Sequence, residues 1–202
     1  MLKRKAILLL LSLGLLQTPL IGQVFAGLSG GGGLNDRVSL RASLPVEFSL
    51  GKHWHLRTGL LLTQQHNPEI LRKLDRSLDH RRVTISYLGV PLTLKGAVPT
   101  GTFTPYALGG LHINYGLRIT TAYIEGGTYG SQLLDFHALQ LTRYDIGAHA
   151  GLGVEKEING RSKIFAELLF FFNFYDIDRA PFAEIYNEGQ VFSIGILFPL
   201  KK

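Results

Sequence analysis

The most constraining feature of this sequence is a pair of adjacent segments, residues 144–158 and 163–175, in which apolar side chains occupy every second position. A period of two is typical of a β-strand that separates two environments. Asn159-Gly160 joins the segments and favours a two-residue turn, because both positions tolerate positive φ. The apolar positions are Tyr144, Ile146, Ala148, Ala150, Leu152, Val154, Ile158, Ile164, Ala166, Leu168, Phe170, Phe172 and Phe174. This ribbon needs an apolar medium on one side, either a protein core or a lipid bilayer.

The same alternation recurs along most of the chain. It is weak and glycine-rich in residues 27–34 and clear in residues 37–50, 53–64, 83–97, 103–120 and 191–200. Together with the ribbon this predicts about eight strands, an even number, as in bacterial outer-membrane barrels. Pro91 counts against the strand that contains it, since proline has no backbone N–H to donate to a neighbouring strand. No stretch after the N-terminal segment offers about 18 uncharged apolar residues, which argues against a helical membrane protein.

The connections between these strands fall into two groups. Short connections are expected at Gly51-Lys52, 98–102 and Asn159-Gly160, on the side of both termini, whereas long polar loops are expected at 65–82, 121–143 and 178–189. Asn35-Asp36 is an exception, a short turn on the long-loop side. A short amphipathic helix after Pro68 and a solvated loop are both compatible with residues 65–82. Short turns at one rim and long loops at the other are typical of an outer-membrane barrel.

The first 26 residues resemble a cleavable signal peptide. Lys3, Arg4 and Lys5 precede an apolar stretch at 6–16, and the small-residue pattern ending at Ala26 predicts Gly27 as the mature start. The alternative is an N-terminal membrane anchor, for which the apolar stretch is short of the roughly 20 residues required. We therefore expect a signal peptide at 1–26 and one barrel domain at 27–202.

Charge and cysteine content exclude several functions. Removal of the signal peptide leaves 18 Lys and Arg against 15 Asp and Glu, a net charge of +3 rather than +6. The basic character therefore gives little support to a nucleic-acid partner. The chain contains no cysteine, so disulfides, thiolate metal sites and a lipid-modified N-terminal cysteine are excluded.

Two all-β architectures fit this pattern. In a soluble lipocalin-like periplasmic barrel the apolar face would point inward, whereas in a transmembrane barrel it would face lipid. The polar faces are rich in Gly, Ser and single charges of both signs, which suits a narrow, packed interior. Aromatic residues also lie near strand ends, as the girdles of a membrane barrel require: Phe48, Trp54, Phe103, Tyr115, Tyr144, Phe174 and Phe198. We expect an antiparallel up-and-down transmembrane β-barrel of about eight strands.

Four motifs resemble the PorT-like, OmpX-sized outer-membrane β-barrel family of Gram-negative bacteria. They are YLGVPLTLK at 87–95, PYALGG at 105–110, DIGAHAGLGVE at 145–155 and VFSIGILF at 191–198. The resemblance implies a location in the cell outer membrane, and such families often carry a proline where this chain has Pro91. Some members are implicated in protein secretion and gliding, and many have no known activity. This chain has Gly89 where the family often has a glutamate, so no role for an interior carboxylate carries over.

The polar faces predict a hydrogen-bonded network inside the barrel, because buried charges must pair. Its expected members are Arg41, Glu47, His53, His55, Arg57, His112, Arg118, Asp145, His149, Glu155 and Glu167. The four histidines of this set could alternatively bind a metal ion. We expect the paired network, with no metal and no cofactor.

The sequence leaves two functional hypotheses. The first is a non-enzymatic barrel whose outer loops bind a protein partner or whose body supports envelope assembly or secretion. The second is a lipid-modifying hydrolase or acyltransferase, for which two loops offer residues: Ser77, Asp79 and His80, and Ser131, Asp135 and His137. Neither set has a nucleophile motif, so no catalytic residue is expected. A transport pore is weaker still, because about eight strands leave no open channel. Expected partners are outer-membrane lipid or lipopolysaccharide, the barrel-assembly machinery and a protein at the outer loops.

Overall fold

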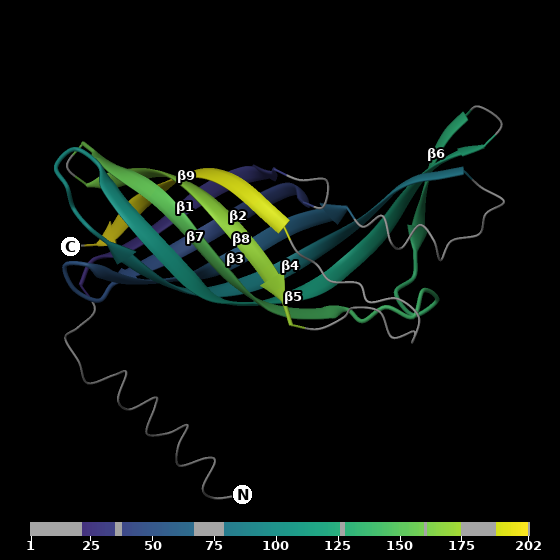
Figure 1. The fold of residues 1–202 in the computed structure, drawn as a ribbon, viewed down its shortest axis with the longest axis horizontal. Helices are drawn as coiled ribbons and strands as arrows, with labels where there is room; N and C mark the ends of the chain where they lie inside the picture. The colour runs from purple at the N-terminus through teal and green to yellow at the C-terminus, as the bar shows by residue number, and fades with distance from the viewer. Residues whose placement is uncertain are drawn as a thin grey trace, which may run out of the picture.

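The computed structural model describes residues 22–34, 38–66, 79–125, 128–159, 161–174 and 189–201, which form a single antiparallel sheet rolled into a barrel (Figure 1). Its strands are β1 (Val24–Gly33), β2 (Val38–Ser49), β3 (Trp54–His66), β4 (Asp79–Ala97), β5 (Thr104–Glu125), β6 (Thr128–Leu134), β7 (Tyr144–Ile158), β8 (Ser162–Asn173) and β9 (Gly189–Lys201). None of the described residues forms a helix long and apolar enough to cross a membrane.

Eight of these strands close the barrel. The order is β4-β3-β2-β1-β9-β8-β7-β5, and β4 pairs with β5 to complete the ring. In the described part of the chain, the ninth strand, β6, pairs only with the far part of β5, from Ile119 to Glu125. In Figure 1 this part of the sheet stands out beyond the barrel. The prediction of an antiparallel barrel of about eight strands is therefore confirmed.

The two ends of the barrel differ in their connections. Val24 at the start of β1 pairs with Lys201 at the end of β9, so both lie at one end, which we call the inner end. The short connections β2–β3, β4–β5 and β7–β8 are at this end too. The opposite, outer end carries the projecting sheet. Short turns face the periplasm and long connections face the exterior in barrels of this kind.

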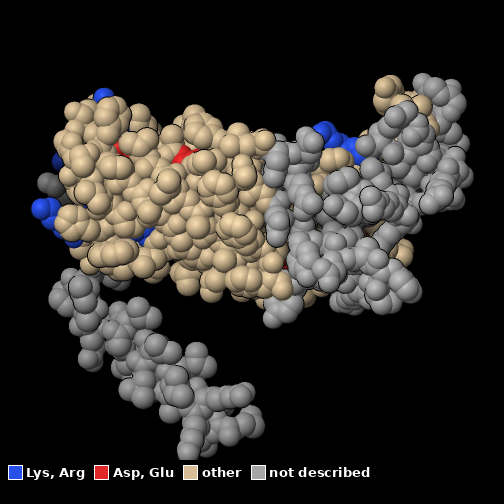
Figure 2. Space-filling model, viewed as in Figure 1, with Lys and Arg blue, Asp and Glu red and all other residues tan. Residues whose placement is uncertain are grey.

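Neighbouring residues on one strand show which face meets lipid. Leu40 is 54% exposed, whereas Arg41 is 7% exposed and points into the barrel. Glu167 is likewise buried, while large aliphatic side chains are exposed along the outer wall. This is the reverse of a soluble protein, and it rules out the lipocalin-like alternative. Figure 2 shows the result as a wall that is almost free of charged side chains between its two ends.

Aromatic residues flank the apolar wall at both ends. Trp54, Phe103 and Phe198 are exposed near the inner end, with Phe48 half-buried beside them. At the outer end the rings of Tyr115 and Tyr144 meet edge to face, 5.3 Å between centroids, and Phe174 is exposed. Aromatic rings at these levels are typical of the two membrane–water interfaces.

Pro91 lies within β4 because the neighbouring ladder is interrupted there. The pairing of β3 with β4 stops at Thr58 and resumes at Leu61. Between them Gly59 adopts a φ of +145°, and the Thr58 hydroxyl donates to the Pro91 carbonyl oxygen at 2.8 Å. The strand thus accommodates a residue that cannot donate to a ladder.

Several predicted boundaries are wrong. Residues 121–143 were predicted as a long loop, but β5 continues to Glu125 and β6 follows. The loop predicted at 65–82 is shorter, since β3 ends at His66 and β4 begins at Asp79, and the helix weighed for this loop lies in residues 67–78, outside the described residues. The loop predicted at 178–189 also lies outside them, except for Gly189 at the start of β9.

The first strand begins before the predicted mature start. Val24, Phe25 and Ala26 belong to β1 and pair with β2 on one side and β9 on the other. Phe25 is 3% exposed and packs with Phe165 and Leu197 in the barrel interior. The predicted signal-peptide boundary after Ala26 thus falls inside β1.

Candidate functional site

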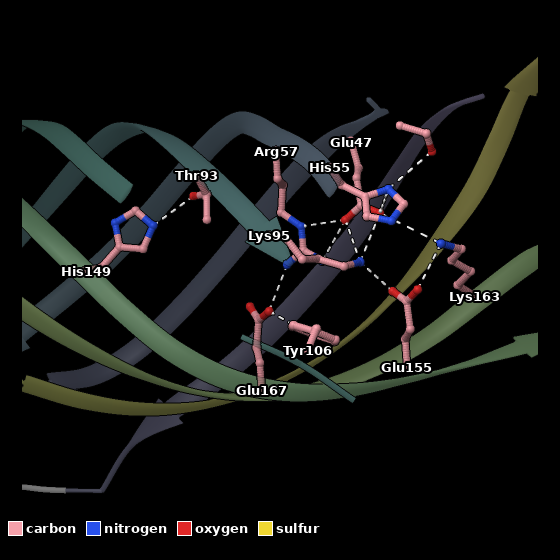
Figure 3. A network of polar contacts seen from close by, with 11 residues as sticks. Glu47, His55, Arg57, Thr93, Lys95, Tyr106, His149, Glu155, Lys163 and Glu167 are labelled. Atoms are coloured by element: carbon pink, nitrogen blue, oxygen red, sulfur yellow. Dashed lines mark hydrogen bonds and ion pairs between the residues drawn. The ribbon is translucent and has the colours of Figure 1, made fainter. Parts of the chain in front are cut away.

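Glu47 on β2 is the centre of an ionic network in the inner half of the barrel (Figure 3). Its Oε2 accepts hydrogen bonds from Nε and Nη2 of Arg57 at 3.0 and 2.9 Å. Lys95 Nζ donates to both Glu47 oxygens at 3.0 Å. The Nδ1 atom of His55 lies 3.5 Å from Oε1. A single carboxylate thus has two cations in direct contact.

Two further carboxylates extend the network across the barrel. Glu155 on β7 accepts from Lys95, and from Lys163 on β8 at 2.9 Å. Glu167 on β8 accepts from Nη1 of Arg57 at 2.8 Å and from the Tyr106 hydroxyl at 3.2 Å. The network therefore links side chains from strands β2, β3, β4, β5, β7 and β8.

The charges within this network balance. Three carboxylates, on Glu47, Glu155 and Glu167, contact three cations, on Arg57, Lys95 and Lys163. Burial of an unpaired charge is strongly unfavourable, so each ion depends on the others. Removal of one partner leaves another charge buried and unpaired. The network is therefore cooperative rather than a set of independent pairs.

A second, mostly neutral layer lies toward the outer end. His149 shares a hydrogen bond of 2.8 Å with the Thr93 hydroxyl. His112 Nε2 donates to the Asn173 side-chain oxygen at 3.0 Å, and Asn173 donates in turn to Asp145 at 2.8 Å. The two imidazole rings are 5.7 Å apart between centroids. The hydrogen bonds of this layer connect β4 and β5 with β7 and β8.

Arg41 occupies the space between the two layers. Its guanidinium lies over the ring of Phe171, 4.8 Å from the centroid. Within the described part of the chain, its Nε and Nη1 atoms have no hydrogen-bond partner. They face a gap of about 30 Å³ that is also lined by Ser43 and Glu167. A polar gap of this size has room for ordered water, which would link the cation to its neighbours.

Apolar side chains close the outer end. Val83, Ile85, Tyr87, Ile119, Phe136 and Leu141 form one buried cluster. The segment after β6 folds back over the barrel mouth, where Gly116 N donates to the Arg143 carbonyl oxygen at 2.6 Å. A Cβ at Gly116 would lie 2.5 Å from the Phe136 ring, so glycine makes room for this ring. The described interior is thus charged near the inner end and apolar near the outer end.

Of the predicted interior set, nine residues are buried inside the barrel. They are Arg41, Glu47, His55, Arg57, His112, Asp145, His149, Glu155 and Glu167. The prediction is wrong for His53, which is exposed in the inner turn before β3, where its Nδ1 donates to the Ala97 carbonyl oxygen at 3.1 Å.

The prediction is also wrong for Arg118, which is exposed on the outer face. Tyr87 pairs with Gly116 and Ser86 pairs with Arg118, so Leu117 is an extra residue in β5. Such a β-bulge reverses the alternation beyond it. Ile119, predicted to face lipid, is consequently buried in the interior.

Sequence reasoning missed three members of the ionic network, namely Lys95, Tyr106 and Lys163. All three fall on the polar face of their strands, so the alternation that placed Glu47 inside applies to them equally. Their omission came from selecting residues by type rather than by face.

Gly89 on β4 leaves room for a polar side chain from the neighbouring strand β5. A Cβ at Gly89 would lie 2.1 Å from the Asn114 side-chain oxygen. The buried Asn114 side chain occupies this space and donates to Asp145 at 3.4 Å. The amide of Asn114 therefore fills the interior space that a side chain at position 89 would need.

The residues weighed for metal binding do not form a ligand cluster among the described residues. No group of three or more His, Cys, Asp or Glu side chains gathers there in a way that could hold a metal ion. Asp135 Oδ1 accepts the backbone N–H of His137 at 2.7 Å, and Ser131 is an exposed residue of β6. Ser77 and the side chains of Asp79 and His80 lie outside the described part.

A closed barrel with an apolar outer wall, aromatic girdles and a filled polar interior defines an integral outer-membrane β-barrel protein. Residues 27–179 match the model of the family described as the outer membrane protein beta-barrel domain, and the chain belongs to this family. No curated protein matches its sequence.

Solved structures of small barrels from Gram-negative bacteria are similar in fold. The N-terminal barrel domain of Pseudomonas aeruginosa OprF shares 12% identity over 88% of this chain and 97% of that chain, with a TM-score of 0.50. Neisserial surface protein A (13%, 87% and 94%, TM-score 0.46) and Yersinia pestis Ail (10%, 88% and 97%, TM-score 0.41) also match. At such identities the similarity concerns the fold.

Proposed function

We propose that this outer-membrane barrel is a non-enzymatic anchor whose projecting outer sheet binds an extended segment of a partner protein. The observation that carries the proposal is the edge strand β6. Among the described residues it pairs with β5 on one side only, and it ends the strand order of the sheet. An edge strand offers unpaired N–H and C=O groups to an incoming strand.

The composition of β6 supports this role. Natural proteins protect exposed edges with lysine, proline or inward-pointing charges. The strand reads TYGSQLL and contains neither charge nor proline. Tyr129 and Leu133 share one face and are 83% and 69% exposed. A partner strand with apolar residues at alternate positions would cover both while it completes the ladder.

The filled interior supports an anchor rather than a pore. Ionic and apolar side chains occupy the barrel from the Glu47 network to the Phe136 cluster. The gap beside Arg41, about 30 Å³, is far smaller than the 300–1,000 Å³ typical of a substrate pocket. The specific surface is then the outer sheet.

Site-specific photo-crosslinking in the native membrane tests the proposal. A photoreactive residue at Leu133 should capture one protein through a short extended segment, and Tyr129→Lys should abolish the capture. Tyr129→Phe is the matched control, because it keeps the ring and the β-propensity, and it should capture normally. Crosslinks to lipid alone, to a second copy of this chain, or equally in the lysine variant would contradict the proposal.

We further propose a subgroup within the family, a route of export and a cellular role for the chain. Membership of the PorT-like group within the family is supported by the four motifs at 87–95, 105–110, 145–155 and 191–198. An N-terminal signal peptide would deliver the chain to the barrel-assembly machinery. A role in secretion or envelope assembly would be exercised through the partner that β6 binds.

A further inference from the structure

The β-bulge in β5 places a cation on the lipid-facing side of the barrel. Up to Gly116 the polar residues of this strand face inward, and an unbroken alternation through Leu117 would turn the Arg118 side chain inward as well. Instead Arg118 is exposed and Ile119 is buried. Bulges commonly re-aim one side chain in this way. The bulge therefore marks Arg118 as a residue that functions outside the barrel.

A second cation lies on the same face of the adjacent strand. Ser86 is directly opposite Arg118, and Arg82 lies four residues further along β4. Because Val83, Ile85 and Tyr87 are buried, Arg82 and Ser86 share the outward face. Four residues of a strand span about 13 Å. Among the described residues, neither arginine has a carboxylate or hydrogen-bond partner.

The level of these arginines is the outer membrane–water interface. Tyr115, which forms the outer girdle with Tyr144, is three residues before Arg118 on β5. The cations thus begin one step beyond the aromatic ring layer. Figure 2 shows lysine and arginine at this end of the described wall, which carries few charged side chains elsewhere. Phosphate groups of the outer leaflet lie at this level.

An apolar hollow leads from Arg118 into the lipid-facing wall. One rung of the sheet runs from Leu40 through Gln64 and Ser86 to Arg118. Below it the small side chain of Ala42 stands beside Leu62 and leaves a shallow hollow of about 400 Å³. The hollow is continuous with the surface that meets acyl chains. It therefore suits a ligand with a phosphate above and a hydrocarbon chain below.

We propose that Arg118 and Arg82 bind the phosphates of lipid A, with one of its acyl chains in the hollow between Ala42 and Leu62. Lipid A carries a phosphate at each end of its disaccharide, which matches two separated cations better than a single-phosphate lipid does. Arginine binds phosphate through charge-assisted, often bidentate, hydrogen bonds. This site is separate from the β6 edge, so either proposal can fail without the other.

Native mass spectrometry of the detergent-solubilised full chain tests the site with lipid A as the probe. The double variant Arg82→Gln/Arg118→Gln should bind lipid A at least about tenfold more weakly than wild type. Arg118→Lys should retain much of the affinity. Arg161→Gln, which removes an exposed cation at the inner turn, is the matched control and should bind as wild type does.

Further comparisons make the result decisive. Removal of both phosphates from lipid A should weaken its binding to the wild-type protein. The fold-change should equal the one that the double variant shows with intact lipid A. Heat-modifiable gel migration will show that each variant is folded. Equal binding of the dephosphorylated lipid, unchanged binding by the folded double variant, or an equal loss in Arg161→Gln would overturn the proposal.

Discussion

Lys95 Nζ lies 3.0 Å from both carboxylate oxygens of Glu47, and neither side chain is accessible to solvent. The two residues come from strands that are not adjacent, since β3 lies between β2 and β4. The pair therefore passes over β3 inside the barrel rather than joining neighbouring strands. Lys95 also pairs with Glu155 on β7, so its charge links three strands across the narrow lumen.

Replacement of Lys95 by methionine should destabilise the barrel severely. The change leaves Glu47 with one fewer cation and Glu155 with only Lys163, in an interior that water cannot reach freely. Loss of one partner from a buried ion pair costs about 3–5 kcal/mol. Urea unfolding in detergent, followed by gel migration, measures the change.

Two controls separate pairing from packing in that experiment. Lys52→Met removes an exposed lysine at the inner turn and should change the free energy of unfolding by no more than about 0.5 kcal/mol. Glu47→Gln combined with Lys95→Met should cost less than the sum of the single changes, because the residues share one network. Strict additivity would show that the network is not cooperative.

Two adjacent glycines in β5 should differ sharply in their tolerance of alanine. A Cβ at Gly110 would lie 2.1 Å from the Leu92 carbonyl oxygen and 2.7 Å from the Thr93 Cα, both backbone atoms that cannot rotate away. A Cβ at Gly109 would meet nothing closer than 3.8 Å. Gly110→Ala should therefore impair barrel assembly, whereas Gly109→Ala should not. The fraction of heat-modifiable protein in outer-membrane preparations measures this, and equal yields would contradict the close approach of β5 and β4.

The mature protein should begin at Gln23 rather than at Gly27. Cleavage after Ala26 would remove Phe25 from its cluster with Phe165 and Leu197, and would shorten β1 where it pairs with β9. Gly22 also supplies a small residue immediately before Gln23, as signal cleavage favours. Intact mass spectrometry of protein extracted from the outer membrane distinguishes the two starts, and a chain that begins at Gly27 would refute the role of Phe25.

Alanine at His80 and His137 should leave the lipid A of the host membrane unchanged. His137 is exposed, and within the described part of the chain its contact with Asp135 is made by its backbone N–H rather than by its ring. Mass spectra of lipid A from cells with wild-type and doubly substituted protein provide the measurement. The disappearance of a lipid A species in the variant would instead favour the hydrolase or acyltransferase hypothesis.

Alternation along the chain was sufficient to predict the eight barrel strands and most of the interior, because lipid on one side and a closed lumen on the other impose a strict period of two. It failed where the period breaks. The extra residue at Leu117 has no signature in hydrophobicity, so Arg118 and Ile119 were assigned to the wrong faces. Strand β6 was missed because it lies beyond the membrane, where no bilayer imposes an apolar face.

Residues 136–143 form an apolar cover at the outer end of the barrel. Phe136→Ala should open this outer cover while leaving the barrel below it intact. The ring of Phe136 packs among Val83, Ile85 and Ile119, and its removal from such a cluster costs about 3–5 kcal/mol. The cover is held by few backbone hydrogen bonds, among them Leu141 N to the Phe136 carbonyl oxygen at 2.8 Å, so local opening should absorb this loss.

Hydrogen exchange resolved by segment measures that opening. Amides of residues 136–143 should lose protection in Phe136→Ala, whereas those of β7 and β8, which contribute to the Glu47 network, should keep theirs. His137→Ala alters an exposed neighbour in the same turn and should change neither segment. Loss of protection throughout the barrel would show that the apolar cover and the Glu47 network unfold as one unit rather than independently.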